Sequence, residues 1–112
     1  MKKLFLCLMM MLFTGTAFAH PPVHIEISFN RETKILAAKI SHPVENTSTH
    51  YVERVEVELN GKEILSHKIS RQDTENEQVM LYLLPDVKTG DEVSVEAHCS
   101  MYGAREEKIK IE

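Results

Sequence analysis

The sequence is poor in cysteine, and the two that it has, Cys7 and Cys99, lie far apart. A redox centre built from clustered cysteines is therefore excluded. The chain also lacks any amphipathic stretch of useful length with a helical period, and it has no internal repeat or low-complexity segment. These absences leave β-strands as the structural elements to expect and single metal-binding side chains as the candidate functional groups.

Positive charge is scarce as well. The chain has 13 lysines and arginines against 17 aspartates and glutamates, which gives a net charge of −4. An acidic surface repels phosphate backbones, so the composition argues against nucleic acid as a partner. Beyond residue 19, no run is long and apolar enough to span a membrane, and we expect no membrane contact from that part of the chain.

The N-terminus has the pattern of a secretory signal peptide. Two lysines precede an apolar run over residues 4–13, and the segment ends in an A-x-A sequence at Ala19. We therefore expect residues 1–19 to be removed. The mature protein would be one domain over residues 20–112, located in a bacterial periplasm, with His20 as its first residue.

Removal of that segment leaves Cys99 without a second cysteine to pair with. An unpaired thiol in an oxidising compartment indicates a role beyond a disulfide. One interpretation is a buried cysteine that acts as a small hydrophobic residue. The other, favoured by its neighbours in sequence, is a reactive thiol or a thiolate that binds a metal.

Short strands account for nearly all of the remaining chain. Alternating apolar residues and turn signals bound the segments. The Asn60-Gly61 pair predicts a tight hairpin turn, because both positions of a type I′ turn need positive φ. An irregular phase at 52–54 indicates a β-bulge. The sequence therefore predicts an all-β fold, a seven-stranded antiparallel immunoglobulin-like β-sandwich, with strands at 23–29, 34–42, 51–60, 64–69, 78–84, 92–99 and 107–112.

Metal-binding side chains gather at three places in the sequence. His20 and His24 lie at the start of the domain, and His98 precedes Cys99 at the end of a strand. The third place is a loop with a histidine at each end, and the first of these, His42, shares the phase of the core residue Ile40. The second is His50. Neutral imidazole and thiolate bind iron, copper and zinc, although histidines scattered over an acidic β-protein are commonly solvated surface residues.

The residues around these positions carry a family resemblance. The run His42-Pro43, followed by His50-Tyr51-Val52-Glu53 and Val55-Glu56, resembles the H-P…H-Y-I-E-W-I-E-L pattern of superoxide reductases, the iron domain of desulfoferrodoxin and neelaredoxin. Cys99-Ser100-Met101-Tyr102-Gly103 is similar to the C-N-x-H-G of that family, and His20-Pro21-Pro22-Val23 to its H-V-P-V. The segments occur in the same order over nearly the whole domain.

The resemblance implies a non-haem iron held by four histidines and a cysteine, with an open position at which superoxide is reduced to peroxide. By position, it assigns His20, His42, His50 and Cys99 as ligands, and Tyr102 stands where the fourth histidine is expected. With three imidazoles and a thiolate, copper or zinc are the alternatives to iron. If the site is active, the protein is an oxidoreductase that acts on superoxide and takes electrons from an unidentified donor.

Two other interpretations stay open. His42-Pro43-Val44-Glu45, His50-Tyr51-Val52, 60–65 and 90–95 are similar to the Z subunit of the Sox thiosulfate-oxidation carrier, which implies a non-catalytic subunit that pairs with a protein partner. Alternatively, a free N-terminal His20 could chelate copper through its α-amine and side chain. Met101 would then be a soft ligand nearby in sequence.

Overall fold

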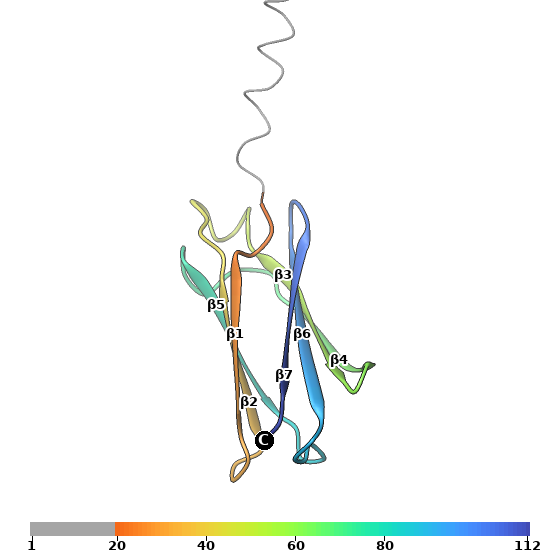
Figure 1. Cartoon of the computed structure of the whole chain (residues 1–112). Coiled ribbons are helices and arrows are strands. Elements are labelled where there is room, and N and C mark those ends of the chain that lie inside the picture. The colour runs from red at the N-terminus through yellow and green to blue at the C-terminus, as the bar shows by residue number, and fades with distance from the viewer. Residues whose placement is uncertain (1–19) are drawn as a thin grey trace, which may run out of the picture.

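The computed structural model describes residues 20–112 and places them in two facing antiparallel sheets (Figure 1). One sheet has the order β1-β2-β5 and the other has the order β4-β3-β6-β7. The described residues contain no helix, hence none that could cross a membrane. The predicted signal peptide lies outside the described residues. The strands are β1 (His24–Asn30), β2 (Ile35–Ser41), β3 (Val52–Leu59), β4 (Lys62–Lys68), β5 (Glu77–Leu83), β6 (Glu92–Cys99) and β7 (Ala104–Lys110).

The structure confirms the all-β class and the seven antiparallel strands, while the immunoglobulin-like classification stays a prediction. The bounds of β6 match the expected strand, and most others move by one or two residues. The largest difference is β7, which begins at Ala104 because Ala104 already pairs with His98. Residues 105–108 of this strand are all charged, so the sequence there shows no alternation of apolar and polar side chains. Val23, the first residue of the strand predicted at 23–29, precedes β1 and is 51% exposed.

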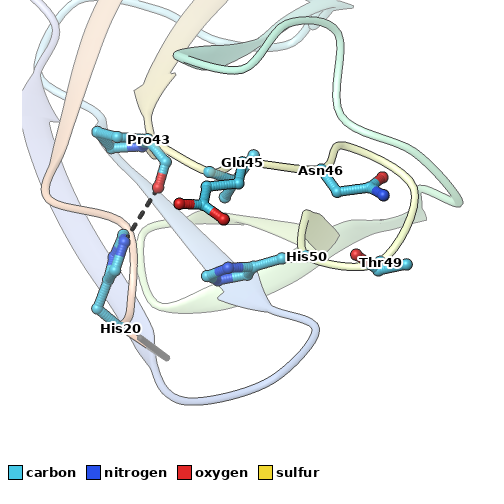
Figure 2. Close-up of a pocket in the computed structure, with 7 residues that line it drawn as sticks. His20, Pro43, Glu45, Asn46, Thr49 and His50 are labelled. Carbon is cyan, nitrogen blue, oxygen red and sulfur yellow. Dashed lines mark hydrogen bonds between the residues drawn. The ribbon is translucent and has the colours of Figure 1, made fainter. Parts of the chain in front are cut away.

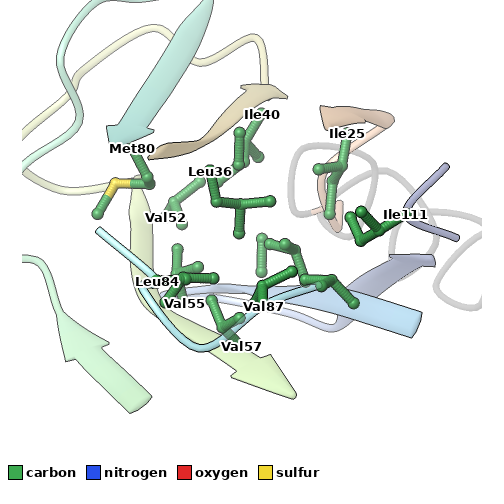
Figure 3. Packing of buried hydrophobic residues seen from close by; sticks show 14 residues of the cluster. Ile25, Leu36, Ile40, Val52, Val55, Val57, Met80, Leu84, Val87 and Ile111 are labelled. Carbon is green, nitrogen blue, oxygen red and sulfur yellow. The ribbon is translucent and has the colours of Figure 1, made fainter. Parts of the chain in front are cut away.

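The core fills the space between the sheets, and every strand with a clean alternation contributes one face to it (Figure 3). Side chains two residues apart along a strand point to the same side of a sheet. The inward residues are mainly β-branched or small, and they have almost no contact with water. They include Ile25 of β1, Leu36, Ala38 and Ile40 of β2, Val52, Val55 and Val57 of β3, and Val93, Val95 and Ala97 of β6.

Two local predictions about β3 are confirmed. Asn60 and Gly61 both have positive φ, at 51° and 84°, as the hairpin turn to β4 requires. The pairing of β3 with β6 shifts register between Val52 and Arg54, which is the predicted bulge. The bulge lets Val52 and Val55 both face the core although they are three residues apart. It also places Val52 opposite Cys99, at the end of the sandwich where the site lies.

Candidate metal centre

Four predicted ligands meet at one end of the sandwich. His20 precedes β1, His42 follows the last residue of β2, and His50 lies just before β3. Cys99 is the last residue of β6. The strand ends of both sheets thus bring together residues that are up to 79 positions apart in the sequence.

The three imidazoles form a tight cluster. One nitrogen from each of His20, His42 and His50 lies within 4.8 Å of the others. Their rings meet edge to face, with centroids 5.1 Å apart for His20 and His42, 5.4 Å for His20 and His50, and 4.8 Å for His42 and His50. Two nitrogens bound to one metal at about 2.1 Å lie at most about 4.2 Å apart, a separation that falls inside this 4.8 Å limit.

The thiol of Cys99 adjoins this cluster. Cys99 is 6% exposed, and its Sγ lies 3.2 Å from Nε2 of His50. Neighbouring nitrogen and sulfur ligands at about 2.1 and 2.3 Å from a metal would be roughly 3.1 Å apart at a right angle. The backbone N–H of Met101 points to the same sulfur at 3.4 Å. The sulfur thus contacts one imidazole of the cluster, that of His50, and lies outside the group of donor atoms that are within 4.8 Å of one another.

Backbone pairing explains why His50 and Cys99 meet. The N–H of Ser100 donates to the carbonyl of Tyr51 at 2.8 Å, and the N–H of Tyr51 donates to Oγ of Ser100 at 3.1 Å. These bonds extend the β3–β6 ladder beyond its last paired residues. On the loop side, the N–H of His50 donates to the carbonyl of Asn46 at 3.0 Å, which closes the turn that presents the imidazole.

The ring nitrogens of His20 and His42 face more acceptors than they have protons to donate. His20 has Nδ1 2.9 Å from the carbonyl oxygen of Pro21 and Nε2 3.0 Å from that of Pro43 (Figure 2). His42 has Nδ1 2.8 Å from Oε1 of Gln72 and Nε2 3.1 Å from the carbonyl oxygen of His20. A neutral imidazole carries one N–H, so one nitrogen of each ring keeps a lone pair beside an oxygen. A neutral imidazole with such a lone pair is the form that binds a metal, and the donor set fits one once the facing oxygen moves aside.

The electrostatics of the cluster favour a neutral His50. Burial lowers its pKa from the usual 6.5, and the neighbouring His42 and His20 lower it further by charge repulsion, against a smaller raising effect of a hydrogen bond that the His50 ring donates to the backbone carbonyl of His20. Because the lowered pKa favours the deprotonated ring, His50 stays able to bind a metal where an ordinary histidine is already half protonated.

A cleft of about 450 Å³ opens beside His20 and His50. Its remaining lining comes from the 43–49 loop, and the carboxylate of Glu45 extends into the space next to the imidazoles (Figure 2). A small molecule could reach the cluster through this cleft. Glu45 is the charged side chain of the lining, and a negative charge there disfavours the approach of an anion.

Tyr102 and Met101 differ from the ligands in their exposure. Tyr102 is 65% exposed, and no hydrogen bond joins its phenol to the cluster within residues 20–112. Its role in place of a fourth histidine stays a prediction. The side chain of Met101 is 57% exposed, although its backbone N–H contacts the sulfur of Cys99.

Two other histidines, which lie near predicted ligands in the sequence, are placed away from the cluster. His24 is an exposed residue of β1. His98 points to the outer face of its sheet, opposite to Cys99, and its Nε2 lies 2.8 Å from a carboxylate oxygen of Glu56 and of Glu96. Neither oxygen accepts a hydrogen bond from Nε2, so both lie off the direction of its N–H bond. Arg54 adjoins the same group, 3.0 Å from Glu56, and we interpret it as a charge network on the outer surface.

Sequence reasoning missed two residues that support the cluster. Gln72 is 1% exposed and contacts His42, yet it lies in a polar connection whose composition predicts only a solvated loop. Gly103 entered the sequence analysis only as the last residue of the motif that begins at Cys99, and the structure gives it a φ of 75°. A Cβ added there would lie 3.1 Å from Cβ of Pro21, the residue that follows His20.

We expect Gly103→Ala to weaken metal binding through His20. The alanine must adopt a left-handed conformation, which costs roughly 1–2 kcal/mol, and its methyl group must displace Pro21. Gly61→Ala is the matched control, because Gly61 also has a positive φ but has nothing within 4 Å of an added Cβ. Thermal unfolding should show a similar loss in both variants, and metal titration a loss in Gly103→Ala alone. Equal affinities in the two variants would contradict the role of this contact.

Comparisons with known proteins support the fold and indicate no activity. No protein-family model and no curated protein matches the chain. Among solved structures, the hypothetical protein PH1083 from Pyrococcus horikoshii OT3 is similar, with a TM-score of 0.50 and 21% sequence identity. The similarity covers 88% of this chain and 93% of that one. At this identity it supports the arrangement of strands alone.

Proposed function

We propose that this domain is a periplasmic non-haem iron protein of the superoxide reductase type, which reduces superoxide to hydrogen peroxide. The observation that supports it is the meeting of His20, His42 and His50 with the buried sulfur of Cys99 at one end of the sandwich. Histidines that were merely solvated would have no reason to converge on a buried thiol. Imidazole and thiolate together suit iron, copper and zinc, and the resemblance in sequence favours iron.

Each residue has a defined part in the proposed site. His42 is completely buried and anchors the metal from the core side, whereas His20 and His50 lie at the edge of the cleft. Cys99 would hold the metal through its sulfur as a thiolate, whose electron density would lower the reduction potential of that metal. The N–H of Met101 stabilises the negative charge on that sulfur.

Bound iron would supply one electron to superoxide, which becomes hydrogen peroxide on taking up two protons. The electron must be replaced by an external donor, since the domain has no cluster of cysteines that could hold a second redox centre. The described part of the cleft contributes Glu45 and no lysine or arginine. We therefore expect superoxide to reach this site more slowly than a site with a cation at its mouth.

The test uses the mature protein purified from a periplasm, with its first residue established by N-terminal sequencing. We expect about one iron per chain, a visible absorption band from thiolate to oxidised iron, and decay of superoxide on rapid mixing with the reduced protein. Zinc or copper in place of iron would contradict the proposed metal. Iron with the band but without superoxide decay would contradict the activity and leave a metal-binding domain. A stable protein partner and no metal would favour the Sox-type subunit.

A further inference from the structure

We propose that Gln72 is a positioning residue for the metal centre, which holds the single ring proton of His42 on Nδ1 and so keeps Nε2 free to bind a metal. The effect of Gln72 on metal affinity rests on the proposed function. The position of the proton, however, is a property of the metal-free protein and can be measured there.

The hydrogen bonds of Gln72 fix which way its amide points. Its Nε2 donates to the carbonyl oxygen of His42 at 2.7 Å and to that of Thr74 at 2.9 Å. Its Oε1 accepts from the backbone N–H of Val52 at 3.1 Å. Carbonyl oxygens only accept and a backbone N–H only donates, so exchanging the two ends of the amide would break all three bonds. The atom that faces His42 is therefore an acceptor.

Two acceptors compete for the one proton of a neutral His42 ring. Oε1 of Gln72 lies 2.8 Å from Nδ1, and the carbonyl oxygen of His20 lies 3.1 Å from Nε2. The shorter contact, inside a fully buried site, favours the proton on Nδ1. Nε2 then keeps its lone pair. With the proton on Nε2 instead, that nitrogen would donate to His20 and could not bind a metal.

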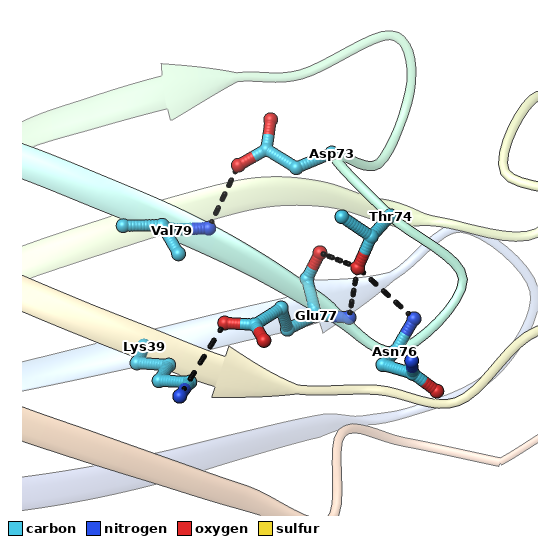
Figure 4. Close-up of polar contacts among 6 residues, drawn as sticks. All are labelled: Lys39, Asp73, Thr74, Asn76, Glu77 and Val79. Carbon is cyan, nitrogen blue, oxygen red and sulfur yellow. Dashed lines mark hydrogen bonds and ion pairs between the residues drawn. The ribbon is translucent and has the colours of Figure 1, made fainter.

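The segment that carries Gln72 is itself held by polar contacts (Figure 4). Oγ1 of Thr74 accepts from the N–H groups of Asn76 and Glu77, both at 3.1 Å. A carboxylate oxygen of Asp73 accepts from the N–H of Val79 at 3.0 Å, which pins the connection to β5. The amide of Gln72 is thus presented in a fixed place.

Gln72 also joins the two loops that build the site. Its backbone N–H donates to the carbonyl of Thr47 at 3.1 Å, within the loop that ends at His50. The same loop and the connection before β5 are linked by the N–H of Val44, which donates to the carbonyl of Glu75 at 2.7 Å. Gln72 therefore sets the proton of His42 through its side chain and contacts the loop that presents His50 through its backbone.

The experiment compares Gln72→Met with Gln72→Glu. Methionine removes the acceptor at Nδ1, whereas glutamate keeps it and loses both donated bonds to backbone carbonyls. Nitrogen-15 NMR of the His42 ring in metal-free protein should show the proton on Nδ1 in the wild type and in Gln72→Glu, and on Nε2 in Gln72→Met. Titration with Co²⁺ should show an affinity about 10–100-fold lower in Gln72→Met, as for other partners of a ligand histidine. Gln72→Glu should bind Co²⁺ more tightly than Gln72→Met.

Both variants are expected to unfold at lower temperature, so a purely structural role would lower their affinities together. Equal affinities, or an Nδ1 proton that persists in Gln72→Met, would overturn the proposal. If Gln72→Met does not fold, the wild type and Gln72→Glu still test the inference, since a proton on Nε2 in either one overturns it. Failure of the domain to bind any metal would refute the proposed function and leave the proton assignment measurable.

Discussion

Replacing His50 with alanine is expected to lower the affinity for iron by more than about 100-fold, since losing a direct ligand costs more than losing an outer partner. His50 suits this test because its ring contacts the sulfur of Cys99 and sits beside the other two imidazoles. It is only partly buried, so the variant leaves no large cavity in the core. The affinity would be measured by anaerobic titration with ferrous iron.

His67→Ala is the matched control for this prediction. His67 is an exposed residue of β4, and its ring contacts the hydroxyl of Tyr82 at 3.3 Å and is no member of the imidazole cluster. We expect its affinity for iron to equal that of the wild type. An unchanged affinity in His50→Ala, with a normal unfolding transition, would remove His50 from the site and leave at most two imidazoles and a thiol.

The alternation of apolar residues predicted which side chains would be buried near the site. His42 shares the phase of Ile40, and by the same period Cys99 falls on the face of Ala97; all four residues are buried. The same rule separates His98 from Cys99, since successive residues of a strand point to opposite faces. The strand period therefore turns the Cys99 side chain toward the core and leaves His98 outside the predicted ligand set, as the structure has it.

The convergence of the ligands could not be read from strand patterns. It depends on which strand ends meet, and hence on a sheet order in which β6 lies beside β3 and β2 beside β5. The resemblance to an iron family brought His20, His42, His50 and Cys99 together in advance. It offered nothing on Gln72, because the burial of that amide follows from how the connection before β5 folds over His42.

Glu45 shows how a surface loop escapes sequence reasoning. Its neighbours 43–49 are polar or conformationally restricted, and the pattern predicts only a loop. The turn closed by Asn46 brings the carboxylate over the cleft, beside His50. The charge at the mouth of the site thus depends on a loop conformation, and it is the opposite of what an anionic substrate would favour.

Cys99→Ser is expected to abolish the visible absorption band of the oxidised iron form, because that band requires a thiolate on the metal. Serine keeps the size and the polar character of the side chain, so the three imidazoles can still hold iron with lower affinity. The fold should survive, since Cys99 contributes one small side chain at the edge of the core. Absorption spectroscopy on iron-loaded protein, with metal analysis of the same sample, makes the measurement.

The matched control is Ser100→Ala, one position further along the chain. Its hydroxyl accepts from the N–H of Tyr51 at 3.1 Å, so the variant loosens the junction of β3 and β6 without touching the sulfur. We expect the band to persist there. A band of unchanged position and intensity in Cys99→Ser would show that the sulfur does not bind the metal. The 3.2 Å contact between Cys99 and His50 would then be a hydrogen bond to a buried thiol, and the site would consist of imidazoles alone.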